Sequence, residues 1–148
     1  MPKYSYPLVK YDFSDGSSDA YAIHTLVPLK ISNPETGEST IILGIVDTGA
    51  DACLFPAEVA EVTGHDLKGD GVISNVTLGI EQREVSVYKH TFTLDLLSPD
   101  YQRTIWSSGE IKVDCTKDNP PVLLGALDFL RHFKLTIDYI NEKLTLEW

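Results

Sequence analysis

The sequence predicts a single domain that is mainly β, with one or two short helices. Three observations lead to this prediction. The chain has 148 residues, of which 43% are hydrophobic, so it is long enough for one core and too short for two ordinary domains. Apolar and β-branched residues alternate with polar ones over much of its length, which is the periodicity of strands. Clusters of Gly, Pro, Asn and Asp separate these segments, as turns do.

The first part of the chain, residues 1–21, is predicted to be an N-terminal arm, and residues 22–148 are predicted to form the folded domain. The arm is rich in Tyr, Pro, Ser, Asp and Gly, and only Tyr11-Asp12-Phe13 alternates as a strand would. Both an irregular arm and an edge strand are consistent with this composition.

A β-hairpin is predicted to follow, and it leads directly into Asp47. Apolar and β-branched residues dominate residues 22–31, and residues 39–46 are strongly β-prone. Between them, residues 33–38 read Asn-Pro-Glu-Thr-Gly-Glu and supply the turn.

A short helix and a long hairpin are predicted next. The helix begins after Phe55, because Pro56 is tolerated in a first helical turn, and it ends at Gly64. Residues 69–97 then alternate in strand fashion and are interrupted by a turn at residues 78–82, which predicts a long projecting hairpin.

The last third of the chain predicts further strands and a second helix. Residues 104–114 fit a strand or a hairpin between two turn-rich loops. Residues 126–133 carry apolar side chains at helical spacing, so they are predicted to be helical. Residues 134–139 and 143–148 are predicted to be two strands around a turn.

The charge balance argues against two classes of function. The chain has 12 Lys and Arg against 22 Asp and Glu, a net charge of -10, and such a surface repels phosphate backbones and anionic membranes. Residues 1–20 contain no apolar stretch long enough for a signal peptide or a membrane anchor. We therefore expect a soluble, cytoplasmic protein that binds neither nucleic acid nor membrane.

The cysteines and histidines indicate neither a disulfide framework nor a metal centre. Only Cys53 and Cys115 are present, and the histidines are scattered without the spacing of metal ligands. We expect both cysteines to be reduced residues of the core, and we expect no metal and no other cofactor.

The most informative stretch is an apolar run that ends in an acidic residue. Residues 41–46 read Ile-Ile-Leu-Gly-Ile-Val, and residues 47–51 read Asp-Thr-Gly-Ala-Asp. A carboxylate directly after a buried strand is costly unless something holds it. Asp-Thr-Gly alone is a weak signal, since it occurs by chance in a chain of this length on the order of a few per cent of the time. A second apolar motif far downstream, residues 122–125 (Val-Leu-Leu-Gly), strengthens it.

Together the two motifs resemble those of the retropepsins, the retroviral-type aspartic proteases, and the likeness is closer to cellular single-domain members. Residues 45–50 (Ile-Val-Asp-Thr-Gly-Ala) match the first family motif, and residues 123–125 (Leu-Leu-Gly) match the second. The resemblance covers residues 22–148. It implies the half-barrel of the acid-protease fold, active as a homodimer, and the function of an aspartic endopeptidase, which is a hydrolase.

The resemblance gives each residue of the first motif a role. Asp47 is the catalytic residue, and Thr48 locks the two catalytic loops of the dimer through hydroxyl hydrogen bonds. Gly49 lets the substrate backbone approach closely, and Ala50 completes the support of the site. Asp51 is a candidate for contact with the substrate backbone.

The resemblance also implies a flap and subsites for the peptide. Leu78, Gly79 and Ile80 lie at the tip of the long hairpin, where they would close over the substrate. Leu123 and Leu124 of the second motif are the other candidate substrate-binding residues. Because these side chains are apolar, the subsites are expected to bury aliphatic or aromatic side chains of a protein or peptide substrate.

One position departs from the viral pattern. Viral members place an Arg directly after the Gly of the second motif, and this chain has Ala126 there. An ion pair to the position of Asp51 would then need another partner, and Arg131 and Arg83 are the two candidates.

The chemistry itself demands a pair of carboxylates. Peptide hydrolysis by water needs a base for the water proton and an acid for the carbonyl oxygen, and two carboxylates that share one proton supply both. Only one Asp-Thr-Gly motif is present, so the second carboxylate is predicted to be Asp47 of another subunit. The strand at residues 143–148 is predicted to lie at the interface, because an unpaired apolar edge would otherwise invite aggregation.

The sequence leaves a second function open. A dimerisation module with the protease fold could bind peptides or ubiquitin-like partners and cleave them little. The intact Asp47-Thr48-Gly49 motif favours the enzyme, since a module without catalysis has no need for a pair of carboxylates at this place.

Overall fold

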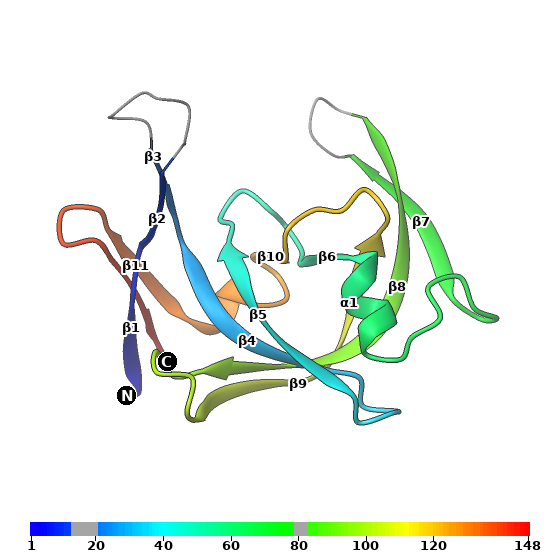
Figure 1. Cartoon of the computed structure of the whole chain (residues 1–148), viewed down its shortest axis with the longest axis horizontal. Helices are drawn as coiled ribbons and strands as arrows, with labels where there is room; N and C mark the ends of the chain where they lie inside the picture. Colours follow the sequence, from blue (N-terminus) through cyan, green and yellow to red (C-terminus); the bar gives the residue numbers. More distant parts are fainter. Residues whose placement is uncertain (13–20, 79–82) are drawn as a thin grey trace.

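The computed structural model describes residues 1–12, 21–78 and 83–148, and in these ranges the chain is mainly β, as predicted (Figure 1). In chain order the elements are β1 (Lys3–Pro7), β2 (Val9–Asp12), β3 (Tyr21–His24), β4 (Leu26–Ser32), β5 (Ser39–Val46), β6 (Leu54–Pro56), α1 (Ala57–Val62), β7 (Ile73–Leu78), β8 (Glu84–Leu97), β9 (Thr104–Thr116), β10 (Leu123–Leu124), the 3₁₀ helix η2 (Leu130–His132), β11 (Lys134–Asp138) and β12 (Lys143–Glu147). No helix in these ranges is long and apolar enough to cross a bilayer.

The main sheet has seven strands in the order β4-β5-β10-β6-β9-β8-β7, and β4 also pairs with β8. This extra pairing brings the two ends of the sheet together, and β7 projects beyond the ring. The interior holds large side chains without exposed surface, such as Leu29, Phe55 and Phe92. Burial of each contributes roughly 1.5–3 kcal/mol, and this closed core is the rigid support on which the candidate site is built.

Three predicted elements are confirmed along this sheet. β4 and β5 form the antiparallel hairpin that leads to Asp47. α1 follows Pro56, and the chain leaves it through Gly64, whose φ of 86° favours glycine. β7 and β8 form the long hairpin. In Figure 1 this hairpin and the β2–β3 ribbon rise on the same side of the molecule, with the β5–β6 loop between them.

Of the two alternatives predicted for residues 104–114, a strand or a hairpin, the structure shows the strand: it is β9, in which Gly109 has a φ of 68° and the register with β8 shifts.

One element differs from its prediction. The segment predicted as a helix at residues 126–133 is a turn followed by the single-turn η2. The spacing of Phe129 and Phe133 serves to pack both rings against Trp106, and β11 begins directly afterwards, which leaves no room for a second turn.

A second sheet joins the two ends of the chain in the order β1-β12-β11. β12 is its central strand, so both edges of β12 are paired within one chain. The unpaired edge that was the reason for placing residues 143–148 at the subunit interface is therefore wrong, and the interface itself stays a prediction. Its pattern is apolar because Leu144 and Leu146 lie in the core without exposed surface. The Tyr6 hydroxyl donates to the carbonyl of Leu97 (2.7 Å) and ties this sheet to β8.

Candidate active site

Asp47 lies at the end of β5, where the two sequence motifs come together. β10 inserts between β5 and β6, parallel to the first and antiparallel to the second, so Leu124 is paired with Val46. The Asp47 N–H donates to the carbonyl of Leu124 (3.1 Å), and the Ile45 N–H donates to the carbonyl of Val122 (2.8 Å). The backbone that carries Asp47 is thereby held by a segment that lies far along the chain.

The loop that follows is organised by the Asp47 carboxylate. The Gly49 N–H donates to Oδ1 of Asp47 (2.9 Å), and the Ala50 N–H donates to the carbonyl of Asp47 (3.2 Å). Asp47 is half-buried, whereas Thr48 and Gly49 are exposed. In the described ranges no ion pair involves Asp47. Its carboxylate accepts one hydrogen bond, which comes from the Gly49 N–H of the same loop.

The far side of the loop is bonded to the segment after β10. The Ala126 N–H donates to the carbonyl of Ala50 (2.9 Å), and the Leu127 N–H donates to the carbonyl of Asp51 (2.8 Å). The Cys53 N–H donates to Oδ2 of Asp128 (2.9 Å). Three hydrogen bonds therefore join residues 50–53 to residues 126–128, and none of them needs a cation.

Gly125 allows this close approach. A Cβ atom at this position would lie 2.3 Å from the carbonyl carbon of Ala52, a distance that real Cβ atoms do not reach. Gly44 makes a milder demand, because its Cβ would lie 2.9 Å from a flexible methyl group of Leu124. Glycine is thus required at residue 125 for packing of one backbone on another.

The predicted site residues are distributed as follows. Residues 47–51 form one loop, as their sequence requires. Leu123 is half-buried, whereas the Leu124 side chain has no exposed surface, so Leu124 supports the loop from within the core rather than facing a peptide. Leu78 is the last residue of β7. Gly79 and Ile80 lie outside the described residues.

The two candidate partners of Asp51 do not reach it within the chain. Among residues 1–12, 21–78 and 83–148, no ion pair links Asp51 to Arg131 or to Arg83. The backbone bond from Leu127 to Asp51 and the Asp128 carboxylate hold the loop instead.

Sequence reasoning missed two residues of this support. Asp128 belongs to neither sequence motif, yet its carboxylate accepts the hydrogen bond from the Cys53 N–H. Thr25 directly precedes β4, and its hydroxyl donates to the carbonyl of Val46 (2.9 Å) while its carbonyl accepts from the Val46 N–H. The only sequence signal for either is a polar residue beside an apolar run, which is too common to single them out.

Neither cysteine has the lowered thiol pKa of a reactive nucleophile. Both thiols are free and buried, as predicted. Burial raises the pKa of Cys53 to about 11 and the pKa of Cys115 to about 12, so both are protonated at neutral pH. In the part of the chain that the structure describes, no three His, Cys, Asp or Glu side chains come together as ligands for a metal ion.

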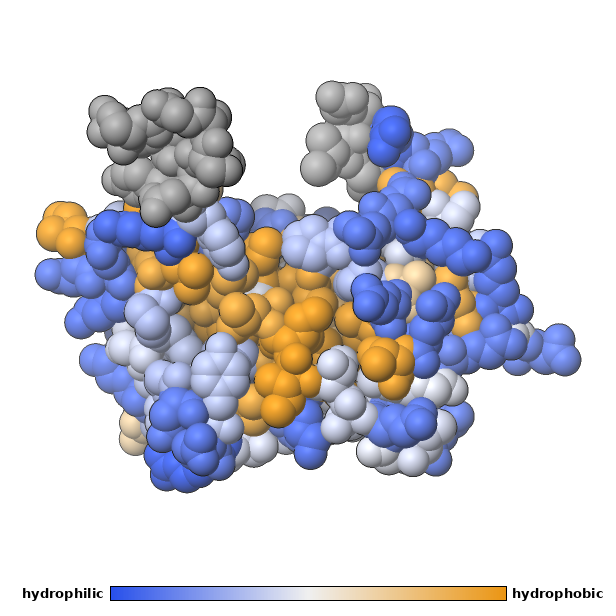
Figure 2. Space-filling view, in the orientation of Figure 1, coloured by the Kyte–Doolittle hydropathy of each residue, from blue (hydrophilic) through white to orange (hydrophobic). Residues whose placement is uncertain are grey.

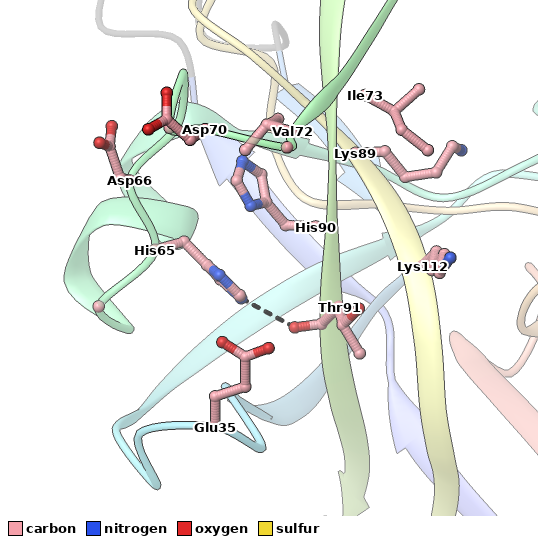
Figure 3. Close-up of a pocket in the computed structure, with 13 residues that line it drawn as sticks. Glu35, His65, Asp66, Asp70, Val72, Ile73, Lys89, His90, Thr91 and Lys112 are labelled. Carbon is pink, nitrogen blue, oxygen red and sulfur yellow. Dashed lines mark hydrogen bonds between the residues drawn. The ribbon is translucent and has the colours of Figure 1, made fainter.

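A polar pocket of about 450 Å³ lies elsewhere in the fold, beside the segment that joins α1 to β7 (Figure 3). Its histidines hold that segment to β8. The ring Nε2–H of His65 donates to the carbonyl of Thr91 (2.8 Å), and the ring Nε2–H of His90 donates to the carbonyl of Leu67 (3.0 Å). No residue of either sequence motif lines this pocket, so it is not part of the candidate active site.

Comparison with known proteins shows the fold of the chain. No protein-family model matches it, and no curated protein matches it in sequence. Among solved structures it is similar to a retropepsin-like aspartic protease from Rickettsia conorii, with a TM-score of 0.56, 19% sequence identity and coverage of 99% of each chain. The class that the sequence suggested is therefore confirmed at the level of architecture: the chain has a retropepsin-like fold.

Proposed function

We propose that the chain is one subunit of a homodimeric aspartic endopeptidase. The observation that carries the proposal is the place of Asp47, which is half-buried at the end of β5 in a loop supported by β10. Backbone support from a distant segment is expected where a carboxylate must be held in position for chemistry. The retropepsin-like fold supports the same function by analogy, since a protease of that fold matches the chain over almost its whole length.

The single chain supplies half of the chemistry. One carboxylate cannot serve at the same time as the base for water and the acid for the carbonyl oxygen, so the proposed enzyme uses Asp47 from each of two subunits. The ionised carboxylate accepts a proton from the attacking water, and the protonated one donates a proton to the carbonyl oxygen of the peptide. Thr48 is exposed in the single chain, as a residue that bonds to the other subunit must be.

The first test is the isosteric change Asp47→Asn. It should lower the rate of peptide hydrolysis by roughly 10²–10⁴-fold, because an amide can neither accept the water proton nor share one. The matched control is Asp70→Asn, which removes an exposed carboxylate from the segment between α1 and β7. A mixed peptide library, read by mass spectrometry, is the substrate.

The outcomes separate the two functions that the sequence left open. Hydrolysis by the parent and by Asp70→Asn, with loss in Asp47→Asn, supports the peptidase. Binding of library peptides without any cleavage, unchanged in Asp47→Asn, supports a peptide-binding module instead. The dimer is tested separately by assaying activity across a dilution series with sedimentation: specific activity should fall as dimers dissociate. Constant specific activity of a monomer would refute the shared site.

A further inference from the structure

Two histidines exchange hydrogen bonds between strand β8 and residues 63–72, here called the connector, which join α1 to β7. The Nε2–H of His65 in the connector donates to the carbonyl of Thr91 in β8 at 2.8 Å (Figure 3). The Nε2–H of His90 in β8 donates to the carbonyl of Leu67 in the connector at 3.0 Å. Each ring therefore bonds to the backbone of the element that carries the other ring.

The two rings also contact each other at the margin of the core. Their centroids lie 4.6 Å apart with an interplanar angle of 41°, and the ring of Phe92 meets the ring of His65 edge to face at 5.0 Å. Phe92 has no exposed surface, and His90 is only 7% exposed. A charge on one ring is therefore screened from the other ring less than it would be at the open surface.

The hydrogen bonds determine where a proton can bind. Because a carbonyl oxygen only accepts, Nε2 carries the hydrogen in each neutral ring, and Nδ1 is the basic nitrogen. A first proton on Nδ1 leaves both hydrogen bonds intact. A second proton gives two positive rings in contact, and their repulsion opposes the packing of the connector on β8.

Charged side chains from four elements line the pocket beside the pair (Figure 3). They are Asp66 and Asp70 of the connector, Glu35 of the β4–β5 turn, Lys89 of β8 and Lys112 of β9. The charge of Lys89 is offset by Asp114, whose Oδ1 lies 3.0 Å from the lysine Nζ. Lys68 of the connector lies over the Tyr88 ring instead, with its Nζ 5.4 Å from the ring centroid. The three carboxylates favour a first proton on the pair, so release depends on the second proton.

The histidine pair lies at the root of the β7–β8 hairpin. β7 begins directly after the connector, and its first residue, Ile73, is paired with Lys89, the neighbour of His90. The hairpin projects from this pairing in Figure 1. Figure 2 shows hydrophilic side chains over this part of the molecule, at the right of the view, and Asp66 and Asp70 of the connector are exposed. Water therefore reaches the connector directly.

We propose that His65 and His90 form a pH-sensitive latch: the pair holds the connector on β8 while at least one ring is neutral, and it releases the connector when both rings are charged. The latch goes beyond the proposed function, since it depends only on the fold. In the proposed peptidase it acts on the root of the hairpin that is predicted to close over the substrate, so this hairpin would be held less firmly in acid.

The direction of the pH effect follows from proton binding. Burial lowers the pKa of His90 in the latched protein, and the neighbouring His65 adds to this, whereas the hydrogen bond to Leu67 and the charge of Asp66 act the other way. Release exposes the ring to water, where its pKa returns toward 6.5, so the released state binds more protons below that pH. The equilibrium constant for release should therefore rise as pH falls, by up to about tenfold per pH unit for each proton taken up.

Hydrogen exchange of the connector amides, read by mass spectrometry at about pH 7.5 and about pH 5.5, measures release. Each rate is divided by the intrinsic exchange rate at the same pH, so that the chemistry of exchange cancels. The N–H groups of Gly69 and Val72 are hydrogen-bonded within the connector (3.1 and 3.2 Å), and their protection should fall by about tenfold or more on acidification. The connector should also exchange at least about tenfold faster than residues 26–46 at both pH values, which separates local release from unfolding of the whole chain.

Two variants each remove the charge of one ring. His65→Gln and His90→Gln keep an amide N–H that can donate to the same carbonyl, but neither new side chain can be charged. In both, connector protection should change by less than about threefold between the two pH values. His132→Gln, at an exposed histidine outside the pocket, is the control and should behave as the parent does.

A titration of the parent followed by NMR needs no variant, so it decides the matter if His90→Gln or His65→Gln fails to fold. The imidazole resonances of His65 and His90 should show two coupled steps, since the second proton binds beside the first. The step at lower pH should coincide with the loss of connector protection.

Three results would overturn the latch. They are an equal pH dependence of connector protection in the parent, both latch variants and the control; independent single-step titrations of the two rings; and equal protection of the connector and residues 26–46 at the lower pH, which would mean that acid unfolds the whole chain.

Peptide hydrolysis by the same proteins, assayed in parallel, keeps the latch and the peptidase apart. Release in acid without hydrolysis at any pH would overturn the peptidase and keep the latch. Hydrolysis by a protein whose connector protection does not change with pH would overturn the latch and keep the peptidase. Absence of both release and hydrolysis would overturn both.

Discussion

The carboxylate of Asp128 accepts a hydrogen bond from the backbone N–H of Cys53 at 2.9 Å, although 75 residues separate them. This bond joins the end of the candidate catalytic loop to the segment that follows the second motif. It does so without the arginine that the viral pattern uses, and the position of that arginine is Ala126 here. Asp128 is therefore a positioning residue of the candidate site.

Removal of this carboxylate should loosen the loop. Asp128→Ala leaves the Cys53 N–H without its acceptor, so the free energy of unfolding should fall by about 1–3 kcal/mol. Asp128→Asn should cost less, because the amide oxygen can still accept. Urea unfolding measures both, and the exposed Asp118→Ala is the control. If Asp128→Ala and Asp118→Ala lose the same stability, the hydrogen bond does not hold the loop.

Two glycines of the motifs should respond differently to alanine. Gly125→Ala forces a Cβ onto the Ala52 carbonyl, so the free energy of unfolding should fall by about 1–3 kcal/mol or more. A Cβ atom at residue 49 would lie 3.4 Å from Oδ1 of Asp47, which is ordinary van der Waals contact, so the Gly49→Ala protein should fold normally. In the proposed enzyme it should still lower activity, because its methyl group stands where the substrate backbone approaches. Thermal unfolding and peptide hydrolysis of both variants decide this, and a well-folded Gly125→Ala protein would contradict the packing argument.

The stability of the protein should depend on His90 in mildly acidic solution. Burial lowers the pKa of His90 below its ordinary value of 6.5, and the neighbouring His65 lowers it further, against raising contributions from the hydrogen bond to Leu67 and from Asp66. His90 is then neutral in the folded protein at a pH where the unfolded chain binds a proton. As pH falls below 6.5, the unfolded state gains that proton first, so the free energy of unfolding falls.

The matched variant is His90→Gln, whose amide can donate to the Leu67 carbonyl but does not titrate. Urea unfolding of both proteins at about pH 7.5 and about pH 5 should show a larger loss for the parent. Equal losses would mean that His90 is not the group responsible.

Truncation of the C-terminus should abolish folding rather than only weaken a dimer. Deletion of residues 143–148 removes the central strand of the second sheet and two fully buried leucines. A milder change, Leu144→Ala, should lower the free energy of unfolding by about 2–5 kcal/mol, against little effect for the exposed Leu127→Ala. Circular dichroism and urea unfolding measure both. A truncated protein with native circular dichroism would contradict the placement of β12 at the centre of its sheet.

The elements that could be predicted from sequence are those made by local patterns. The β4–β5 hairpin, α1 and the β7–β8 hairpin follow from alternation, from Pro56 and Gly64, and from turn residues, because each forms between neighbours in the chain. The Asp47 loop was recognised for the same reason, as a short motif directly after a strand.

The remaining features depend on pairings that periodicity cannot reveal. The apolar pair Leu123-Leu124 does not reveal that these two residues insert between β5 and β6. Likewise, the sequence around Tyr11 and His24 does not reveal that their rings meet edge to face. The apolar pattern of residues 143–148 correctly predicted a strand. It could not reveal that both edges of this strand are paired, since one partner, β1, comes from the opposite end of the chain.

The insertion of β10 between β5 and β6 also determines at which stage of synthesis the Asp47 loop gains its backbone partners. A nascent chain that has emerged only as far as β9 contains Asp47 and its whole loop, but it lacks the Leu124 carbonyl and the Asp128 carboxylate that hold them. The loop therefore lacks these hydrogen-bond partners until residues 122–128 have been synthesised, because contacts across so many residues close late. A product that ends before residue 122 carries Asp47 without the backbone support of β10.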